Sequence, residues 1–270
     1  MANWNKLSSR GRVEDRRGFG PSAIGGVSIT GVAILLLVNY LSGGDISDVI
    51  TQLDSLPAQT QTADDQSTFA GADEYEVFAA TVLGSTNDLW EGIFSSQSKT
   101  YTEPTLVLFR GATESACGAA TSQVGPHYCP VNKTIYLDET FFDELQYRFG
   151  ARGGDVAEAY VIAHEVAHHV QNELGTLGMQ RSNDDSIKTE LQADCYAGLW
   201  ANSIRHLDVF SEGEILEALD AAAAVGDDRI QERVTGYVNP ENWTHGSSEQ
   251  RVQWFSKGYE SGDFSQCSVD

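Results

Sequence analysis

The alternation of apolar and polar positions divides the chain beyond residue 73 into helices and strands. Two short runs rich in apolar and β-branched residues, "TLVLFRG" at 105–111 and "KTIYLD" at 133–138, predict strands. Apolar residues recur at helical spacing through much of the remainder. This spacing predicts helices at 73–94, 139–149, 155–173, 186–206, 212–225 and 248–260. The elements indicate an α+β domain that is mostly helical with a small sheet.

The segment before this domain has a different pattern. Ala23 to Leu41 is a run of 19 residues without a charged side chain, just long enough to span a bilayer core. Basic residues precede the run and acidic residues follow it, which predicts an N-terminus in the cytoplasm. We therefore expect a cytoplasmic basic tail at 1–22, one transmembrane helix at 23–41, a polar linker at 42–72 and an extracytoplasmic domain at 73–270. A cleaved signal peptide and a buried helix are the alternatives to the anchor.

Composition narrows the class of protein and its compartment. The 270 residues are 41% hydrophobic with a net charge of −22, which suits one globular domain and argues against a nucleic-acid partner.

Four cysteines outside the membrane favour disulfides, and three pairings are available. We favour Cys117 with Cys129, which closes a short loop. Cys195 with Cys267 would then tie the C-terminal tail to the helix predicted at 186–206; a structural zinc site is the alternative, although no CxxC spacing exists.

The stretch "AYVIAHEVAHHVQNELG", 159–175, contains a metal-binding pattern. His164 and His168 are four apart, so they lie one turn apart on one helix face, whereas His169 points away. With Glu165 they form HExxH, in which the imidazoles bind Zn²⁺ and the glutamate is the general base. A chance match is the competing explanation, but apolar flanks indicate a buried helix, where unpartnered imidazoles would be unfavourable.

Start and stop signals frame this helix. Asp155 as N-cap and Glu158 three positions later predict a capping box. Gly175 is typical of the position just after a helix end.

The third zinc ligand is expected on the next helix. The metzincin extension would need Gly at 171 and His at 174, and Gln171 and Leu174 exclude it. Glu190 and Asp194 follow, four apart on one face, in an arrangement that resembles the glutamate zincins, the thermolysin-like class. The resemblance implies that Glu190 is the third ligand and that Asp194 accepts the ring N–H of His164, which fixes its tautomer. The reverse assignment, with Asp194 on the metal, stays open.

Several stretches together resemble the bacterial family of neutral zinc metallopeptidases. They are "ACGAATSQVGPHYCPVNKTIYLD", "AYVIAHEVAHHVQ", "ELQADCYAGLWA" and "THGSSEQRVQWFSKGYESGD", together with "RVEDRRG" before a hydrophobic segment. The resemblance covers nearly the whole chain except the linker, and it departs at Ala167, where Gly is expected. It implies a membrane-anchored protease with one zinc ion per chain.

The stretch "THGSSEQR", 244–251, is similar to a segment that follows the zinc-binding helices of membrane-embedded zinc proteases. The similarity implies that His245 stabilises the oxyanion of the reaction. It also implies that Arg251 orders the site or pairs with Asp194 or Glu190. The alternative is a plain helix start, with Ser247 and Gln250 as a capping box and His245 in a turn.

These patterns predict a zincin-like fold and a zinc-dependent endopeptidase with a peptide or protein substrate. Ile135 to Leu137 is the expected edge strand that aligns the substrate backbone by β-addition. Two other functions stay open: a zinc amidase acting on cell-wall peptides, and a catalytically inactive zinc-binding module. The intact Glu165 argues against the second, because a structural site needs no general base.

Overall fold

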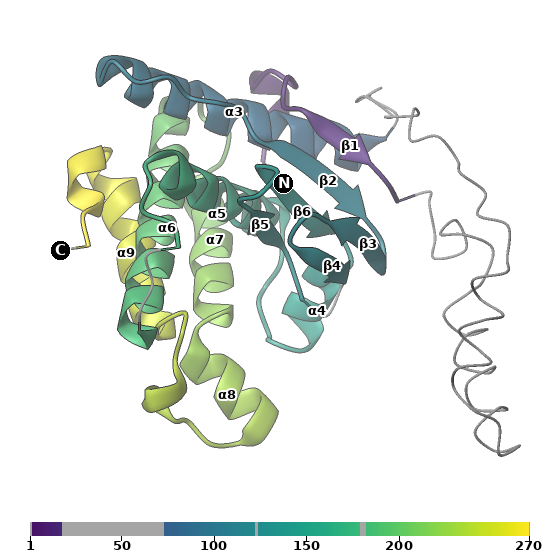
Figure 1. Cartoon of the computed structure of the whole chain (residues 1–270), viewed down its shortest axis with the longest axis vertical. Coiled ribbons are helices and arrows are strands. Elements are labelled where there is room, and N and C mark those ends of the chain that lie inside the picture. The colour runs from purple at the N-terminus through teal and green to yellow at the C-terminus, as the bar shows by residue number, and fades with distance from the viewer. Residues whose placement is uncertain (1, 18–72, 122–123, 179–181, 270) are drawn as a thin grey trace, which may run out of the picture.

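A computed structural model describes residues 2–17, 73–121, 124–178 and 182–269 of the chain (Figure 1). It has a mixed α+β architecture, mostly helical with small sheets, as the sequence predicts. The predicted anchor at 23–41 and the linker at 42–72 lie outside the described residues. Within the described part of the chain, no helix combines the length and the apolar character needed to cross a membrane.

The helices are α3 (Glu74–Ser96), α4 (Phe141–Tyr147), α5 (Asp155–Glu173), α6 (Asn183–Ser203), α7 (Glu212–Ala224), α8 (Asp227–Thr235) and α9 (Ser248–Ser261), with 3-10 turns at Trp4–Lys6, Arg205–Leu207, Pro240–Asn242 and Phe264–Cys267.

The main sheet has four strands in the order β1-β2-β6-β5. The strands β2 (Thr105–Phe109) and β6 (Thr134–Asp138) are parallel and correspond to the two predicted strands. The strand β1 (Val13–Asp15) pairs in parallel with β2, and β5 (His127–Cys129) pairs antiparallel with β6. The expectation that 135–137 forms the edge is wrong, because β6 is hydrogen-bonded on both sides and buried along its whole length. The edge next to α5 is β5, which is too short to give a clear period in the sequence.

Two disulfides tie peripheral segments to this frame. The strands β3 (Ala112–Ser115) and β4 (Gly118–Thr121) form a hairpin whose turn contains Cys117. Cys117 is bonded to Cys129 at the end of β5, and Cys195 of α6 is bonded to Cys267 near the C-terminus. The favoured pairing is therefore confirmed.

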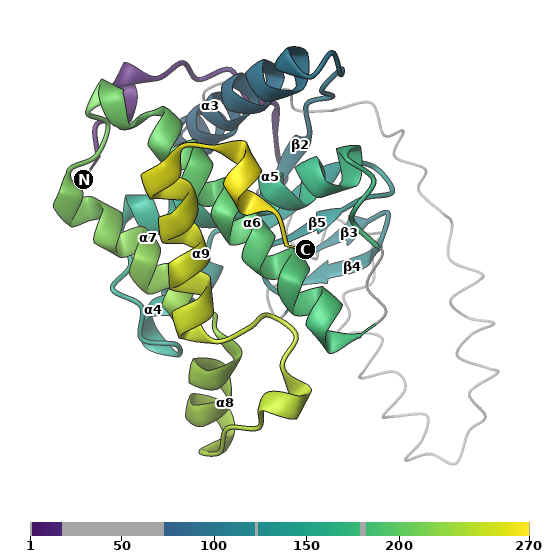
Figure 2. The same ribbon diagram turned by 90° about the vertical axis from the view of Figure 1, so that its left-hand side faces the viewer.

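The helix α5 lies at the centre of the fold, packed by α3, α6 and α7 (Figure 2). The helices α6 and α9 approach one another closely because each has a glycine at the contact. A methyl group on Gly198 would lie 2.1 Å from the carbonyl oxygen of Phe255, and one on Gly258 would lie 2.0 Å from that of Cys195. Only glycine fits at either position, and the close contact holds α9 against the helix that carries Glu190.

The start of α5 differs from the prediction. Its N-cap is Gly154, and no side chain caps the helix there, so the capping box of Asp155 and Glu158 is wrong. The carboxylate of Asp155 instead accepts hydrogen bonds from the backbone N–H of Ala2, at 2.8 Å, and from Nε1 of Trp4, at 2.9 Å. An acidic residue in the first turn still complements the helix dipole.

Two other helix ends agree with the sequence. The helix α5 ends at Glu173, and Gly175 follows in a left-handed conformation with φ of 75°. Ser247 and Gln250 form a capping box at the start of α9.

Residues 2–17 are part of the folded unit. Besides the β1 pairing, the backbone N–H of Asn3 donates to the carbonyl oxygen of Val209, and Val13 is 1% exposed. Residues 2–17 therefore pack against the domain that was expected to begin at 73, while the boundaries at 22, 41 and 72 stay predictions. Their basic side chains suggested a tail, but the strand pairing needs β2, which lies far along the chain.

Candidate metal centre

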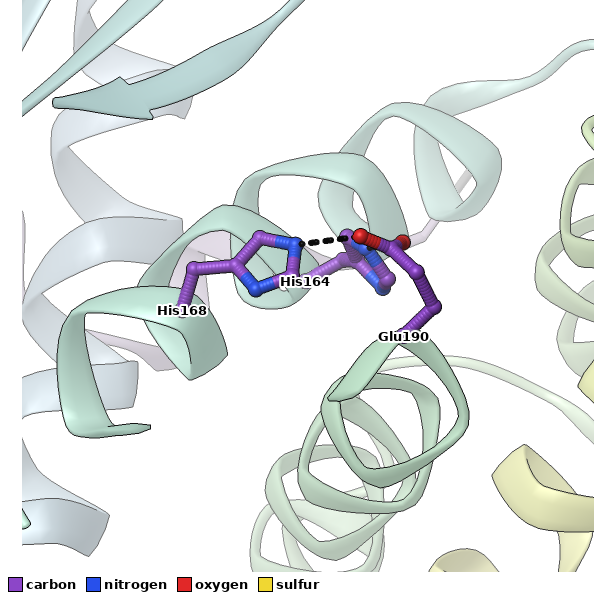
Figure 3. A group of neighbouring side chains, drawn as sticks. All are labelled: His164, His168 and Glu190. Carbon is purple, nitrogen blue, oxygen red and sulfur yellow. Dashed lines mark hydrogen bonds and ion pairs between the residues drawn. The ribbon is translucent and has the colours of Figure 1, made fainter. Parts of the chain in front are cut away.

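Two helices bring three metal-ligating side chains together (Figure 3). His164 and His168 project from successive turns of α5, and Glu190 projects toward them from α6. The Nε2 atom of His164 lies 3.2 Å from Oε2 of Glu190, and Nε2 of His168 lies 3.4 Å from Oε1. One ligand atom from each residue lies within 4.8 Å of the other two.

The donor set fits a zinc ion. A tetrahedral Zn²⁺ with bonds of about 2.0–2.2 Å to nitrogen and oxygen would separate its ligand atoms by about 3.3–3.5 Å. The two nitrogen-to-oxygen separations are close to this value. Two imidazoles and one carboxylate are also one of the usual ligand sets of catalytic zinc sites, which leave a fourth position open.

Each imidazole has an acceptor behind it. Nδ1 of His164 donates to Oδ1 of Asp194 at 2.9 Å, and Nδ1 of His168 donates to Oε1 of Gln171 at 2.9 Å. Such contacts fix the tautomer, so that each Nε2 keeps its lone pair for a cation. The structure therefore places Asp194 behind His164, whereas Asp194 is not in the group of three that could hold the ion.

Asp194 is fully buried and has several partners. Arg251 of α9 donates from Nε to Oδ2 at 2.8 Å and from Nη2 to Oδ1 at 2.9 Å. The hydroxyl of Tyr160 donates to Oδ1 at 2.6 Å. A buried carboxylate needs partners of this kind, since leaving one charge unpaired is strongly unfavourable. Of the two partners expected for Arg251, Asp194 makes the close contact, and Nη2 also lies 3.9 Å from Oε2 of Glu190.

Gln171 and Tyr160 are site residues that the sequence interpretation missed. Gln171 also donates from Nε2 to the carbonyl oxygen of Thr189 at 2.7 Å, which joins α5 to α6 beside Glu190. Their positions could have suggested these roles, because Gln171 is three residues after His168 and Tyr160 is four residues before His164. Neither residue type is unusual on a helix, so spacing was the only available signal.

The charges of the site act on one another. Burial alone would lower the pKa of His164, but hydrogen bonds to Asp194 and Glu190 raise it to about 9. Burial alone would raise the pKa of Glu190, but the charges and hydrogen bonds of the two histidines hold it well below its usual range. Without a metal, His164 is therefore protonated at neutral pH, and a metal ion must displace that proton to bind.

The three ligands line a cavity of about 570 Å³. Glu165, which is 7% exposed, lines it beside them. One wall comes from β5 and the residues before it. The other walls are largely apolar, and they include Phe141, Phe149, Val161, Val225 and Ile230.

The other histidines lie apart from the group of three. His169 is buried; its Nε2 donates to the carbonyl oxygen of Thr102 at 2.6 Å, and its Nδ1 accepts from the hydroxyl of Tyr128 at 3.0 Å. His245 is half exposed and lines the same cavity. Its Nδ1 lies 3.2 Å from Oδ1 of Asp227, whose Oδ2 also accepts from the backbone N–H groups of residues 244–246. The loop that carries His245 is thus held by one carboxylate at the start of α8.

Comparisons with known proteins identify the family of the chain. The model of the family described as "Putative neutral zinc metallopeptidase" matches residues 2–269. The chain is 40% identical to the uncharacterized protein YpfJ of Escherichia coli K12 over 283 residues, which covers 98% of each chain. It is 45% identical to the uncharacterized protein Rv2575 of Mycobacterium tuberculosis H37Rv over 214 residues, which covers 74% of this chain and 73% of that one. No solved structure matches the chain.

The family match includes both helices of the metal centre, the loop of His245 and the N-terminal strand. On this match and the two sequence identities, the chain belongs to the family described as putative neutral zinc metallopeptidases.

Proposed function

We propose that the protein is a zinc-dependent endopeptidase with a zincin-like active site. The observation that carries the proposal is the position of Glu165, which lines the same cavity as the three ligands and is not one of them. A purely structural zinc site would gain nothing from a carboxylate beside an open coordination position.

The residues around the cavity have three roles: metal binding, proton transfer and positioning of the ligands. His164, His168 and Glu190 would hold the Zn²⁺, which supplies Lewis-acid chemistry by lowering the pKa of water and polarising a carbonyl oxygen. Glu165 accepts a proton from the attacking water and passes it to the leaving amine. Asp194 and Gln171 keep the two imidazoles in the tautomer that binds a cation, and Arg251 keeps Asp194 charged and in place.

The substrate is a peptide in extended conformation. The strand β5 is the outer strand of the sheet on the side of the cavity, and His127 and Tyr128 of this strand line the cavity. A free strand edge can pair with an extended backbone, which gives affinity without depending on sequence. His245 is the proposed partner of the oxyanion, because Asp227 engages its Nδ1 and Nε2 makes no hydrogen bond to the residues described.

We propose that the protein acts outside the cytoplasm. Two disulfides join all four cysteines of the chain. Such bonds persist in oxidising compartments and are rare in the cytosol.

Glu165→Gln tests the proposal directly. The change keeps the size and helix propensity of the side chain but removes the basic oxygen. Peptide hydrolysis should fall by about 10²–10⁴, the usual contribution of a general acid–base group. Zinc content, measured by elemental analysis, should stay near one ion per chain.

Glu173→Gln is the matched control, because Glu173 lies on the same helix and pairs with Lys133, away from the ligands. It should leave both zinc content and hydrolysis unchanged. Full hydrolysis by Glu165→Gln would overturn the assigned base. Hydrolysis of cell-wall peptides without hydrolysis of unfolded protein would replace the endopeptidase with the amidase, and no hydrolysis by the zinc-loaded wild type would favour the inactive module.

A further inference from the structure

The N-terminal segment, defined as residues 2–17, completes the sheet of the domain. Val13, Glu14 and Asp15 pair with Leu106, Val107 and Leu108 of β2, and Figure 1 shows β1 beside β2 and α3. The backbone N–H of Leu106 donates to the carbonyl oxygen of Arg12, and that of Arg16 donates to Leu108. Without this segment β2 would be an uncovered edge next to the core.

The fit of the N-terminal segment is close along its length. A methyl group on Gly11 would lie 2.6 Å from the carbonyl oxygen of Ala80 in α3. Trp4 stacks on the buried Trp200 and meets Phe78 edge-on, with ring centroids 6.5 and 5.3 Å apart. Through Asp155 the segment also contacts the first turn of α5, the helix that carries both histidine ligands.

The chain leaves the domain and returns to it at one place. Arg17 is the last described residue before 18–72, and Asp73 is the first after it. Nη2 of Arg17 lies 2.5 Å from Oδ2 of Asp73, and Nη1 lies 2.6 Å from Oε2 of Glu139. The guanidinium is only 6% exposed, so this contact belongs to the fold.

Two of the five basic residues of the segment, Arg10 and Arg17, have acidic partners in the domain. Arg10 pairs with Asp88, Glu91 and Glu103, in addition to the pairs of Arg17. Basic residues before an apolar run normally indicate the cytoplasmic side, because they resist translocation. Here the acidic domain accounts for two of them, which weakens their value as a sign of topology.

A single crossing at 23–41 would place residues 2–17 and 73–270 on opposite faces of the membrane, where none of these contacts could form. We propose that the N-terminal segment and the metal centre lie on the same side of the membrane. The uncharged run from Ala23 to Leu41 then attaches the protein to the lipid bilayer without carrying the N-terminus across it. This inference concerns attachment and holds whichever reaction the site performs.

Labelling with a membrane-impermeant maleimide tests the proposal in full-length protein. Ser8→Cys places a thiol on the exposed surface of the N-terminal segment, and Ser95→Cys places one at the end of α3. The natural cysteines are all in disulfides and do not react. In intact spheroplasts both new thiols should label, or neither should, and both should label to completion after solubilisation in denaturant. Labelling of one in intact cells and of the other only after permeabilisation would overturn the proposal.

A second measurement separates docking from sidedness. A specific protease site inserted after residue 60 allows the membrane-bound protein to be cut between the apolar run and the domain. The domain should remain in the membrane pellet after cutting, held by the docked segment, and the additional change Gly11→Leu should release it. Release of the domain from the cut wild-type sequence would show that the segment does not hold it.

Discussion

At the residue scale, the orientation of the His168 imidazole depends on Gln171, whose side-chain amide does not titrate. Gln171→Leu removes the acceptor of Nδ1, so the imidazole can turn or change its tautomer. Changes behind a metal ligand typically weaken metal affinity by roughly 10–100-fold, and we expect a loss in this range. Gln171→Glu retains an acceptor and should lose less. Competition with a chelator of known affinity measures both, and equal, wild-type affinity in the two variants would remove Gln171 from the site.

The raised pKa of His164 predicts opposite effects of pH on the metal-free and zinc-loaded protein. The pKa of a histidine is about 6.5 in an unfolded chain, and the pKa of His164 is about 9 in the folded protein. Protonation of His164 therefore stabilises the folded, metal-free protein, and this stabilisation is fully present below about pH 6.5. That stabilisation is lost as pH rises through 9. Zinc must displace the same proton, so its apparent affinity should rise about tenfold per pH unit between pH 7 and 9.

Thermal unfolding with chelator and with zinc, at pH 6.5 and pH 9, checks this coupling. The melting temperature of the metal-free protein should fall from pH 6.5 to pH 9. The gap in melting temperature between the zinc-loaded and the metal-free protein should therefore widen. A zinc affinity that does not change over this range would contradict the assigned proton.

The spacing of four between His164 and His168 predicts from helix geometry that the two imidazoles share a face. The roles of Glu190 and Asp194, also four apart, were implied by the resemblance to the glutamate zincins, and the structure brings all four residues to one place. Gln171 and Tyr160 could not, since their role depends on which helix lies opposite. The oxyanion role of His245 stays a prediction.

At the scale of elements, the contact between α6 and α9 sets where Arg251 meets Asp194. Gly258→Ala would force a methyl group against the backbone of Cys195, and no flexible side chain is available to move aside. Overpacking of this kind is typically unfavourable by about 1–3 kcal/mol. We expect a loss of stability near the upper end, with lower hydrolysis because α9 shifts relative to Asp194.

Gly92→Ala in α3 is the control, since a methyl group there meets nothing within 4 Å. It should raise the free energy of unfolding by about 0.5–1 kcal/mol, the helix preference for alanine. Chemical denaturation measures both variants, and a neutral Gly258→Ala would show that the helices can move apart without loss.

Elements with a long apolar period were predictable, and those defined by a distant partner were not. The strands β2 and β6 and the helices α5, α6 and α9 agree with the pattern to within a few residues. The strands β1 and β5 have three residues each, and α8 is short and polar. Their conformation is fixed by what they pack against, and local sequence contains little of that information.

At the scale of the whole molecule, the contact between Arg17 and Asp73 predicts that residues 18–72 can be replaced. A chain in which a short Gly/Ser linker joins Arg17 to Asp73 should fold, bind zinc and melt close to the temperature of the full-length protein. A chain that begins at residue 73 loses Val13 and Trp4 and should melt well below it. Full burial of one large apolar side chain is worth about 1.5–3 kcal/mol.

Calorimetry of the two shortened chains makes the comparison. Equal melting temperatures would mean that the N-terminal segment contributes nothing to the domain.

The pairing of β1 with β2 also orders events during synthesis. Val13 pairs with Leu106, ninety-three positions later. At about 5–20 residues per second, the ribosome needs roughly 5–20 s to make that partner. The uncharged apolar run at 23–41 is also synthesised before that partner. The first strand to be synthesised is therefore one of the last to take its place in the sheet, because its partner β2 is made so much later.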